Sequence, residues 1–185
     1  MTKKLPILGI CATGSNSGKT TLITKLIPEL AKHDIRVSVI KHAHHKFDID
    51  HPGKDSYEIR EAGAVQTLVA SAKRWALITE MQHTPTPPDE ANLDELIQLI
   101  DPNYADLILV EGFKNSEIPK IEVHRPSLGM PMLCLNDANI IAIASDSAPA
   151  KNTELPVLDL NNIEEITNFI LNRLTARKLT TNDKA

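Results

Sequence analysis

Aromatic residues are scarce in this 185-residue chain and make up only 3% of it. That scarcity argues against the aromatic platforms on which proteins stack single-stranded nucleic acid. The formal net charge is −4, so the chain lacks the strongly basic character used for non-specific binding to nucleic acid or anionic membranes. No apolar run approaches the ~20 residues of a membrane helix, and we expect no signal peptide. We therefore expect a cytoplasmic protein that binds neither nucleic acid nor membrane.

Cysteine is also scarce, with only Cys11 and Cys134. Each lies in an apolar, strand-like run, and two buried thiols suit a reducing compartment better than a disulfide scaffold. Hydrophobic residues, by contrast, make up 42% of the chain, enough for one sizeable core. We expect one domain in residues 1–175, followed by a flexible polar tail in residues 176–185.

Strand-like and helix-like segments alternate along the chain, which predicts an α/β fold with a mostly parallel central sheet flanked by helices. Residues 5–12 form a near-continuous apolar run, typical of a strand buried on both faces. Residues 65–70 and 75–79 predict an inserted β-hairpin. Further strands are expected at residues 37–40, 107–110, 140–144 and 156–160, and helices at 20–32, 56–62, 93–100 and 163–174.

The strongest motif is TGSNSGKT, from Thr13 to Thr20. It follows a predicted strand and opens a predicted helix, which is the context that a P-loop requires. Thr13 departs from the pattern, which has glycine there. The alternative is a glycine-rich helix start that binds nothing. With strand, loop and helix in this order, we predict a P-loop NTPase-like fold, with residues 1–175 as the nucleotide-binding domain.

The physics of such a loop assigns a role to each part. Glycines let successive amide groups turn toward an anion, and the helix N-terminus adds partial positive charge. Lys19 would reach the β- and γ-phosphates and act in catalysis, and Thr20 would ligate Mg²⁺. The loop residues expected to bind nucleotide are Gly14, Ser15, Asn16, Ser17, Gly18, Lys19, Thr20 and Thr21.

A second motif, DLILVEG, runs from Asp106 to Gly112 and resembles a Walker B strand. Such strands end in a carboxylate that holds Mg²⁺ or orients the attacking water. Here that carboxylate is Glu111 rather than Asp, and we expect it to bind the metal and to act in catalysis. Gly112 would let the backbone approach the γ-phosphate. The alternative is a core strand that ends in a solvated glutamate.

The guanine-reading string Asn-Lys-x-Asp is absent, and its nearest substitute is Ser145-Asp146. These residues follow a predicted strand, and ligands of open α/β sheets sit beyond the carboxyl ends of strands. Asp146 could accept hydrogen bonds from the ring N–H and the amino group of guanine. The sequence alone favours the alternative, a turn residue that caps the strand end.

Three further segments carry a family resemblance: PGKDS at residues 52–56, RWALITE at 74–80 and LVEGFK at 109–114. Together with the P-loop they resemble molybdopterin-guanine dinucleotide biosynthesis protein B, the MobB family, over nearly the whole chain. The resemblance implies a homodimer that binds GTP and Mg²⁺ and hydrolyses GTP weakly. It also implies work beside a MobA-type guanylyltransferase, which attaches GMP to molybdopterin, with molybdopterin or molybdoenzymes as further partners.

A polar loop at residues 41–55 carries four histidines, His42, His44, His45 and His51. Contact with nucleotide or pterin, a solvated loop, and a Zn²⁺ or Ni²⁺ site are the alternatives, in that order. Asp50 in this loop is a further candidate ligand for Mg²⁺.

Two other enzymatic functions remain open, a small-molecule kinase and a metallochaperone GTPase, as does a non-enzymatic scaffold with a vestigial P-loop. No arginine finger or water-positioning glutamine is identifiable, so we expect slow turnover. Arg60, Arg74 and Arg125 are candidates for a finger supplied across a dimer.

Overall fold

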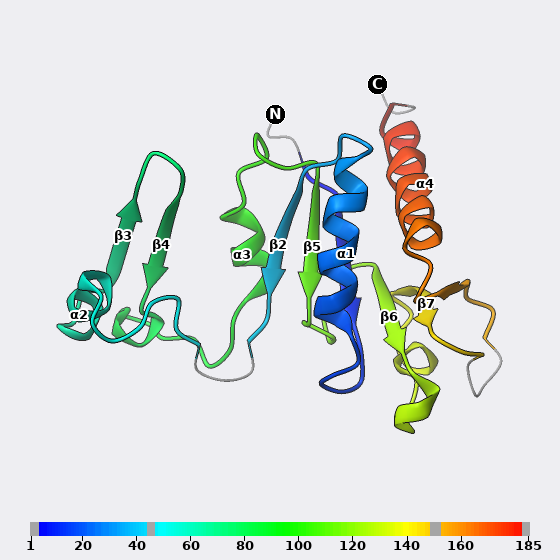
Figure 1. The fold of residues 1–185 in the computed structure, drawn as a ribbon, viewed down its shortest axis with the longest axis horizontal. Coiled ribbons are helices and arrows are strands. Elements are labelled where there is room, and N and C mark those ends of the chain that lie inside the picture. The colour runs from blue at the N-terminus through cyan, green and yellow to red at the C-terminus, as the bar shows by residue number, and fades with distance from the viewer. Residues whose placement is uncertain (1–3, 44–46, 149–152, 183–185) are drawn as a thin grey trace. The chain divides into compact units, whose positions relative to one another are not determined.

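The computed structural model describes residues 4–43, 47–148 and 153–182 of the chain. The chain divides into two compact units (Figure 1). The sheet unit consists of residues 1–42 and 93–185, and the hairpin unit consists of residues 43–92. None of the helices in the described part of the chain combines the length and the apolar character that a membrane crossing requires.

The sheet unit contains a six-stranded sheet in the order β2-β5-β1-β6-β7-β8, and every neighbouring pair is parallel. This arrangement confirms the predicted parallel sheet. β1 lies between β5 and β6, so the strand before the P-loop is next to the strand with the Walker B-like motif. The strands are β1 (Ile7–Cys11), β2 (Val37–Lys41), β5 (Leu107–Glu111), β6 (Lys120–His124), β7 (Ile140–Ser145) and β8 (Val157–Asp159).

Helices cover both faces of this sheet (Figure 1). On one face, α1 (Lys19–Ala31) and α4 (Ile163–Asn182) pack on the larger core cluster. On the other face, the short helix α3 (Leu93–Gln98) packs on a second cluster beneath β2 and β5. The buried side chains of α1 are Leu22, Ile23, Leu26 and Leu30, a spacing that places them on one side of the helix.

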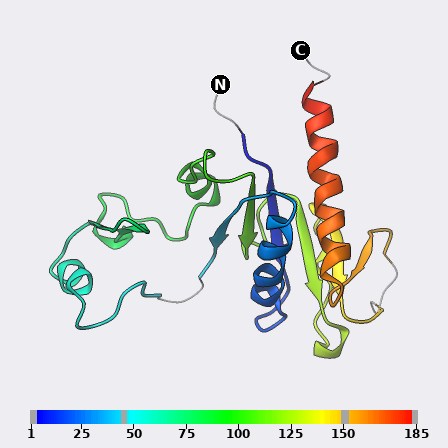
Figure 2. The ribbon, with the colours of Figure 1, turned by 45° about the horizontal axis from the view of Figure 1, so that its top comes forward.

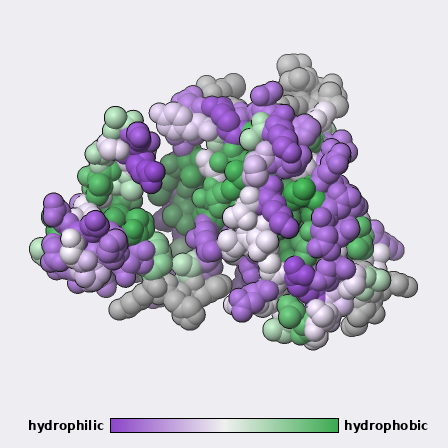
Figure 3. All heavy atoms as spheres, in the orientation of Figure 1, coloured by the Kyte–Doolittle hydropathy of each residue, from purple (hydrophilic) through white to green (hydrophobic). Residues whose placement is uncertain are grey.

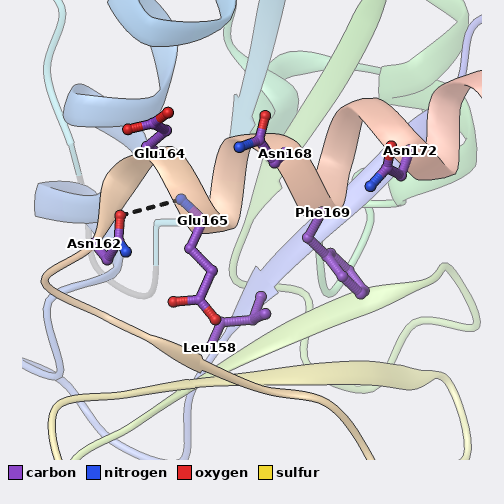
Figure 4. A pocket seen from close by; sticks show the side chains of 7 residues that line it. All are labelled: Leu158, Asn162, Glu164, Glu165, Asn168, Phe169 and Asn172. Carbon is purple, nitrogen blue, oxygen red and sulfur yellow. Dashed lines mark hydrogen bonds between the residues drawn. The ribbon is translucent and has the colours of Figure 1, made fainter.

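The helix α4 extends further than its apolar pattern predicts, to Asn182 instead of residue 174. It begins with a capped turn, in which the backbone N–H of Glu165 donates to Oδ1 of Asn162 at 3.2 Å (Figure 4). Ile166 and Ile170 anchor its first turns in the core. A helix that is nucleated in this way continues through Ala, Arg, Lys and Leu because these residues have high helix propensity.

Hydrophobic periodicity did not predict β6, although all five of its residues are buried. Its apolar residues alternate with Lys120, Glu122 and His124 on the other face. The carboxylate of Glu122 accepts hydrogen bonds from the backbone N–H groups of Leu133 and Cys134, at 2.7 and 2.9 Å. The loop after the strand thus supplies the partners that let a charged side chain be buried.

The fully buried ammonium of Lys120 is likewise paired, at 3.0 Å from the carboxylate of Asp137. Burial by itself would raise the pKa of Asp137, but hydrogen bonds from Lys120 and Asn139, together with the charge of Lys120, outweigh burial and lower that pKa. Burial raises the pKa of the nearby Cys11 thiol to about 12 and that of Cys134 to about 11. Both cysteines are free, and Cys11 is buried in β1 as predicted. Cys134 instead lies in the 3₁₀ turn η3 (Leu133–Leu135) and is only partly buried.

The hairpin unit contains α2 (Asp55–Glu61), β3 (Gln66–Ala70), the 3₁₀ turn η1 (Met81–His83) and β4 (Trp75–Thr79). β3 and β4 pair antiparallel, which confirms the predicted hairpin. The buried guanidinium of Arg60 holds the unit together through ion pairs with Asp50 and Glu80, both at 2.9 Å. Its hydrogen bonds to these carboxylates raise the pKa of Arg60, so it stays charged.

Candidate functional site

The loop between β1 and α1 joins the end of the strand to the start of the helix (Figure 2). Its backbone conformation suits an anion-binding turn. Asn16 and Gly18 both adopt left-handed conformations, with φ of 60° and 99°. Where left-handed residues alternate with right-handed ones, successive backbone N–H groups point to the same side and can surround an anion. Gly18 stands directly before Lys19, the first residue of α1, so the helix N-terminus adds its partial positive charge.

Side chains of the loop reinforce this turn. The ammonium of Lys19 donates to the carbonyl oxygen of Gly14 at 3.0 Å and so lies back across the loop. The hydroxyl of Ser17 donates to the same oxygen at 2.8 Å and is buried. Ser15 and Asn16 are exposed and form the rim of the loop.

Thr20 and Glu111, predicted from separate motifs, meet in the structure. The hydroxyl of Thr20 donates to Oε1 of Glu111 at 2.8 Å. Glu111 is buried at the carboxyl end of β5, where it is paired in register with Ile10 of β1. A hydroxyl and a carboxylate oxygen at this separation are hard ligands of the kind that Mg²⁺ prefers.

A lysine that the motifs did not identify completes this group. Lys41, the last residue of β2, places its ammonium 3.3 Å from Oε1 of Glu111 and 3.4 Å from the Thr20 hydroxyl. The available signal was an apolar strand ending in a charged residue, the same pattern that identified Glu111. The group therefore pairs the negative charge of Glu111 with the positive charge of Lys41.

Gly112 is required by its surroundings. Its φ of +90° is left-handed, and a Cβ there would lie 2.9 Å from the Cβ of His42. His42 stacks on Phe113 with ring centroids 4.5 Å apart, and its backbone N–H donates to the carbonyl of Glu111 at 2.9 Å. One predicted loop histidine is thus anchored beside the Walker B-like strand.

Ser145 is the last residue of β7, one residue beyond the predicted end of the strand, and Asp146 follows it. The Ser145 hydroxyl is buried and donates to the carbonyl of Ser147 at 2.7 Å. The carboxylate of Asp146 pairs with Nη1 of Arg125, whose Nε donates to the carbonyl of Ser17 at 3.0 Å. The end of β7 is therefore connected to the phosphate loop.

The remaining candidates lie elsewhere. Asp50 belongs to the hairpin unit, where Arg60 engages it, and its role as a magnesium ligand stays a prediction. Burial alone would raise the pKa of Asp50, but hydrogen bonds from Arg60 and Ser56 lower it. His44 and His45 lie outside the described residues, as does the end of the expected tail, residues 183–185. Within the described ranges, no three His, Cys, Asp or Glu side chains are grouped to hold a metal ion.

A shallow pocket on α4 has the wrong charge for a nucleotide (Figure 4). Glu164 and Glu165 lie along it with Asn162, Asn168 and Asn172, and two carboxylates would repel phosphates. The loop after β1 therefore remains the candidate site.

The chain is similar to a known protein family over most of its length. The family model described as "Molybdopterin guanine dinucleotide synthesis protein B", MobB, matches residues 7–146, a span that includes the P-loop, Glu111 and Asp146. This chain belongs to the MobB family.

Relatives cover nearly the whole MobB chain. The molybdopterin-guanine dinucleotide biosynthesis adapter protein of Escherichia coli K12 is 48% identical over 170 residues, which are 90% of this chain and 92% of the relative. The protein of the same description from Haemophilus influenzae is 46% identical over 175 residues, 94% and 92% of the two chains. The crystal structure of a MobB homolog from Bacillus stearothermophilus, at 24% identity, superposes with a TM-score of 0.66 over 92% of this chain and 98% of that one. This likeness confirms the P-loop NTPase-like fold.

Proposed function

We propose that this MobB chain is a GTP-binding adaptor with weak GTPase activity in the biosynthesis of molybdopterin guanine dinucleotide, where it assists a MobA-type guanylyltransferase. The adaptor role is supported by relatives that carry that description at 48% and 46% identity. The observation that carries the nucleotide part is the contact between Thr20 and Glu111 beside the phosphate loop.

The residues present fit a magnesium nucleotide. The loop amides and Lys19 offer donors to phosphate oxygens, and Thr20 and Glu111 offer oxygen ligands to Mg²⁺. Bound Mg²⁺ would neutralise charge on the phosphates. Glu111 would hold the metal or orient the attacking water through the second oxygen of its carboxylate.

We expect slow hydrolysis because Arg125, the arginine beside the phosphate loop, is already paired with other groups. Arg125 uses its Nε and Nη1 to bind Ser17 and Asp146 of its own chain. An arginine that stabilises the transition-state charge is worth several orders of magnitude in rate, ~10³-fold or more. Without one, hydrolysis would be slow enough for the nucleotide to act as a switch.

Homodimerisation is part of this proposal, and the hairpin unit supports it. Leu68 and Leu77 are directly paired across the strands and are 63% and 48% exposed, and Trp75 on the same face is 66% exposed. Figure 3 shows apolar residues at the surface of the hairpin unit. A two-stranded sheet is marginally stable by itself, and its edges invite pairing. A second copy would bury this apolar face in a two-fold interface.

Light scattering should therefore find twice the mass of the chain at micromolar concentration, and Leu68→Asp should reduce it to the mass of one chain. A charge on the apolar face would have to be desolvated in the interface. Leu99→Asp, at a residue 77% exposed in the sheet unit, is the matched control and should leave the dimer intact. A wild-type monomer, or a dimer unaffected by Leu68→Asp, would argue against this interface.

The adaptor role is tested by reconstitution. A MobA-type guanylyltransferase, molybdopterin and GTP are incubated with and without this protein, and molybdopterin guanine dinucleotide is measured. We expect a higher yield with the wild-type protein and no increase with Lys19→Ala. An unchanged yield with the wild-type protein would contradict the adaptor role.

A further inference from the structure

One guanidinium connects the phosphate loop with Asp146, the candidate ligand of the guanine base. Arg125 is the first residue after β6. Its Nε donates to the carbonyl of Ser17 in the phosphate loop at 3.0 Å, and its Nη1 pairs with Oδ2 of Asp146 after β7. Nε and Nη1 are two atoms of one rigid, planar guanidinium. The two hydrogen bonds therefore fix the distance between the phosphate loop and the carboxylate of Asp146.

The guanidinium is closely packed against the loop backbone. A Cβ at Gly18 would lie 3.2 Å from Nη2 and 3.7 Å from Nε of Arg125. Both side chains of the ion pair are largely covered, with 32% of Arg125 and 23% of Asp146 exposed. The contact is therefore shielded more than a surface ion pair, and solvent screens it less.

The segment after Arg125 supports the other end of the loop. The hydroxyl of Thr13 donates to the carbonyl of Pro131, and a Cβ at Gly14 would lie 3.0 Å from Cε of Met130. Thr13, which stands where the consensus has glycine, thus has a structural use. Residues 125–131 hold the phosphate loop at both ends, and only Arg125 extends this brace to Asp146.

We propose that Arg125 is a positioning residue for base selection, a role that rests on the proposed GTP site. It holds Asp146 at a fixed place relative to the phosphate loop, so that a nucleotide anchored by its phosphates presents its base edge to that carboxylate. A carboxylate has about four lone-pair positions, and the bond to Nη1 leaves others for the two guanine donors. Discrimination by hydrogen bonding depends on such fixed geometry.

The Arg125→Lys variant distinguishes the effect of the positive charge of Arg125 from the effect of its planar guanidinium. Lys keeps the positive charge but has no planar fork, so it cannot hold Ser17 and Asp146 in one fixed arrangement. A structural brace alone would alter the affinities for GTP and ATP by the same factor, because both carry the same triphosphate. A positioning role changes their ratio.

The test is calorimetric titration with GTP and with ATP, in Mg²⁺, for the wild-type protein, Arg125→Lys, Asp146→Asn and the double variant. We expect Asp146→Asn to lower the GTP-to-ATP affinity ratio by about tenfold, the effect of one unsatisfied buried partner. Arg125→Lys should lower the ratio by about three- to tenfold, and the double variant should be no lower than Asp146→Asn alone because the two side chains act as a unit. Arg36→Lys is the matched control, since Arg36 makes a comparable forked pair with Asp106 and should leave the ratio unchanged.

The outcomes separate this inference from the function it rests on. A lower ratio in Asp146→Asn with an unchanged or higher ratio in Arg125→Lys overturns the positioning role and leaves the GTP site standing. An unchanged ratio in Asp146→Asn shows that the base is read elsewhere and overturns the inference, while phosphate binding is judged from the GTP affinity itself. Thermal melting checks the fold of each variant, and Arg125→Gln replaces Arg125→Lys if the lysine variant does not fold.

Discussion

Lys19→Ala should abolish tight binding of GTP. The Lys19 ammonium lies across the phosphate loop and donates to the neutral carbonyl oxygen of Gly14. A bound triphosphate would replace this contact with contacts to charged phosphate oxygens. Hydrogen bonds to charged groups are worth about 1.5–3 kcal/mol each. Loss of bonds to two phosphates should weaken binding by about 100-fold or more.

Calorimetric titration with GTP and Mg²⁺ measures this effect. The matched control is Lys32→Ala, which removes a surface lysine that pairs with Glu29 at the C-terminal end of α1, the end opposite the phosphate loop. This variant should bind GTP as the wild type does. Lys19 is only partly buried, so its truncation should leave the thermal midpoint nearly unchanged. A folded Lys19→Ala protein with wild-type affinity for GTP would refute the assignment of the loop.

Glu111→Gln should slow GTP hydrolysis far more than it weakens GTP binding. Glutamine has nearly the same shape and can still accept from Thr20, but it removes the negative charge that a metal or an attacking water needs. Groups that act on charge developing in the transition state typically contribute about 10²–10³ in rate. We expect a loss of that order in single-turnover hydrolysis and a change of less than about tenfold in affinity.

The control for this pair of measurements is Glu117→Gln, at an exposed glutamate on the loop after β5. It carries the same chemical change and should alter neither rate nor affinity. Equal hydrolysis rates in Glu111→Gln and the wild type would make Glu111 an ordinary strand-end residue whose contact with Thr20 is structural.

Short local motifs account for what the sequence predicted correctly. The phosphate loop needs only its own glycines and the strand and helix on either side, all within residues 5–32. Glu111 was found because a buried strand ends in a carboxylate, and the hairpin because two β-rich segments flank a tight turn. Each of these features is determined by neighbouring residues, so each can be read without knowing the fold.

Features whose partners lie far along the chain were missed. β6 does not look like a strand, because its charged residues become buried only when the loop at residues 126–137 covers them. Lys41 joins Glu111 only because β2 pairs with β5. Arg125 was a candidate solely as a finger across a dimer, whereas the fold brings it to Ser17 and Asp146 of its own chain.

The most direct measurement of the central claim, a magnesium-dependent GTP site at Thr20 and Glu111, is GTP affinity with Mg²⁺ and with EDTA. If these oxygens hold the metal between protein and phosphates, removal of Mg²⁺ should weaken GTP binding by at least about tenfold. The same removal should have much less effect on Glu111→Gln, which has already lost a charged ligand. Equal wild-type affinities in Mg²⁺ and EDTA would contradict the account.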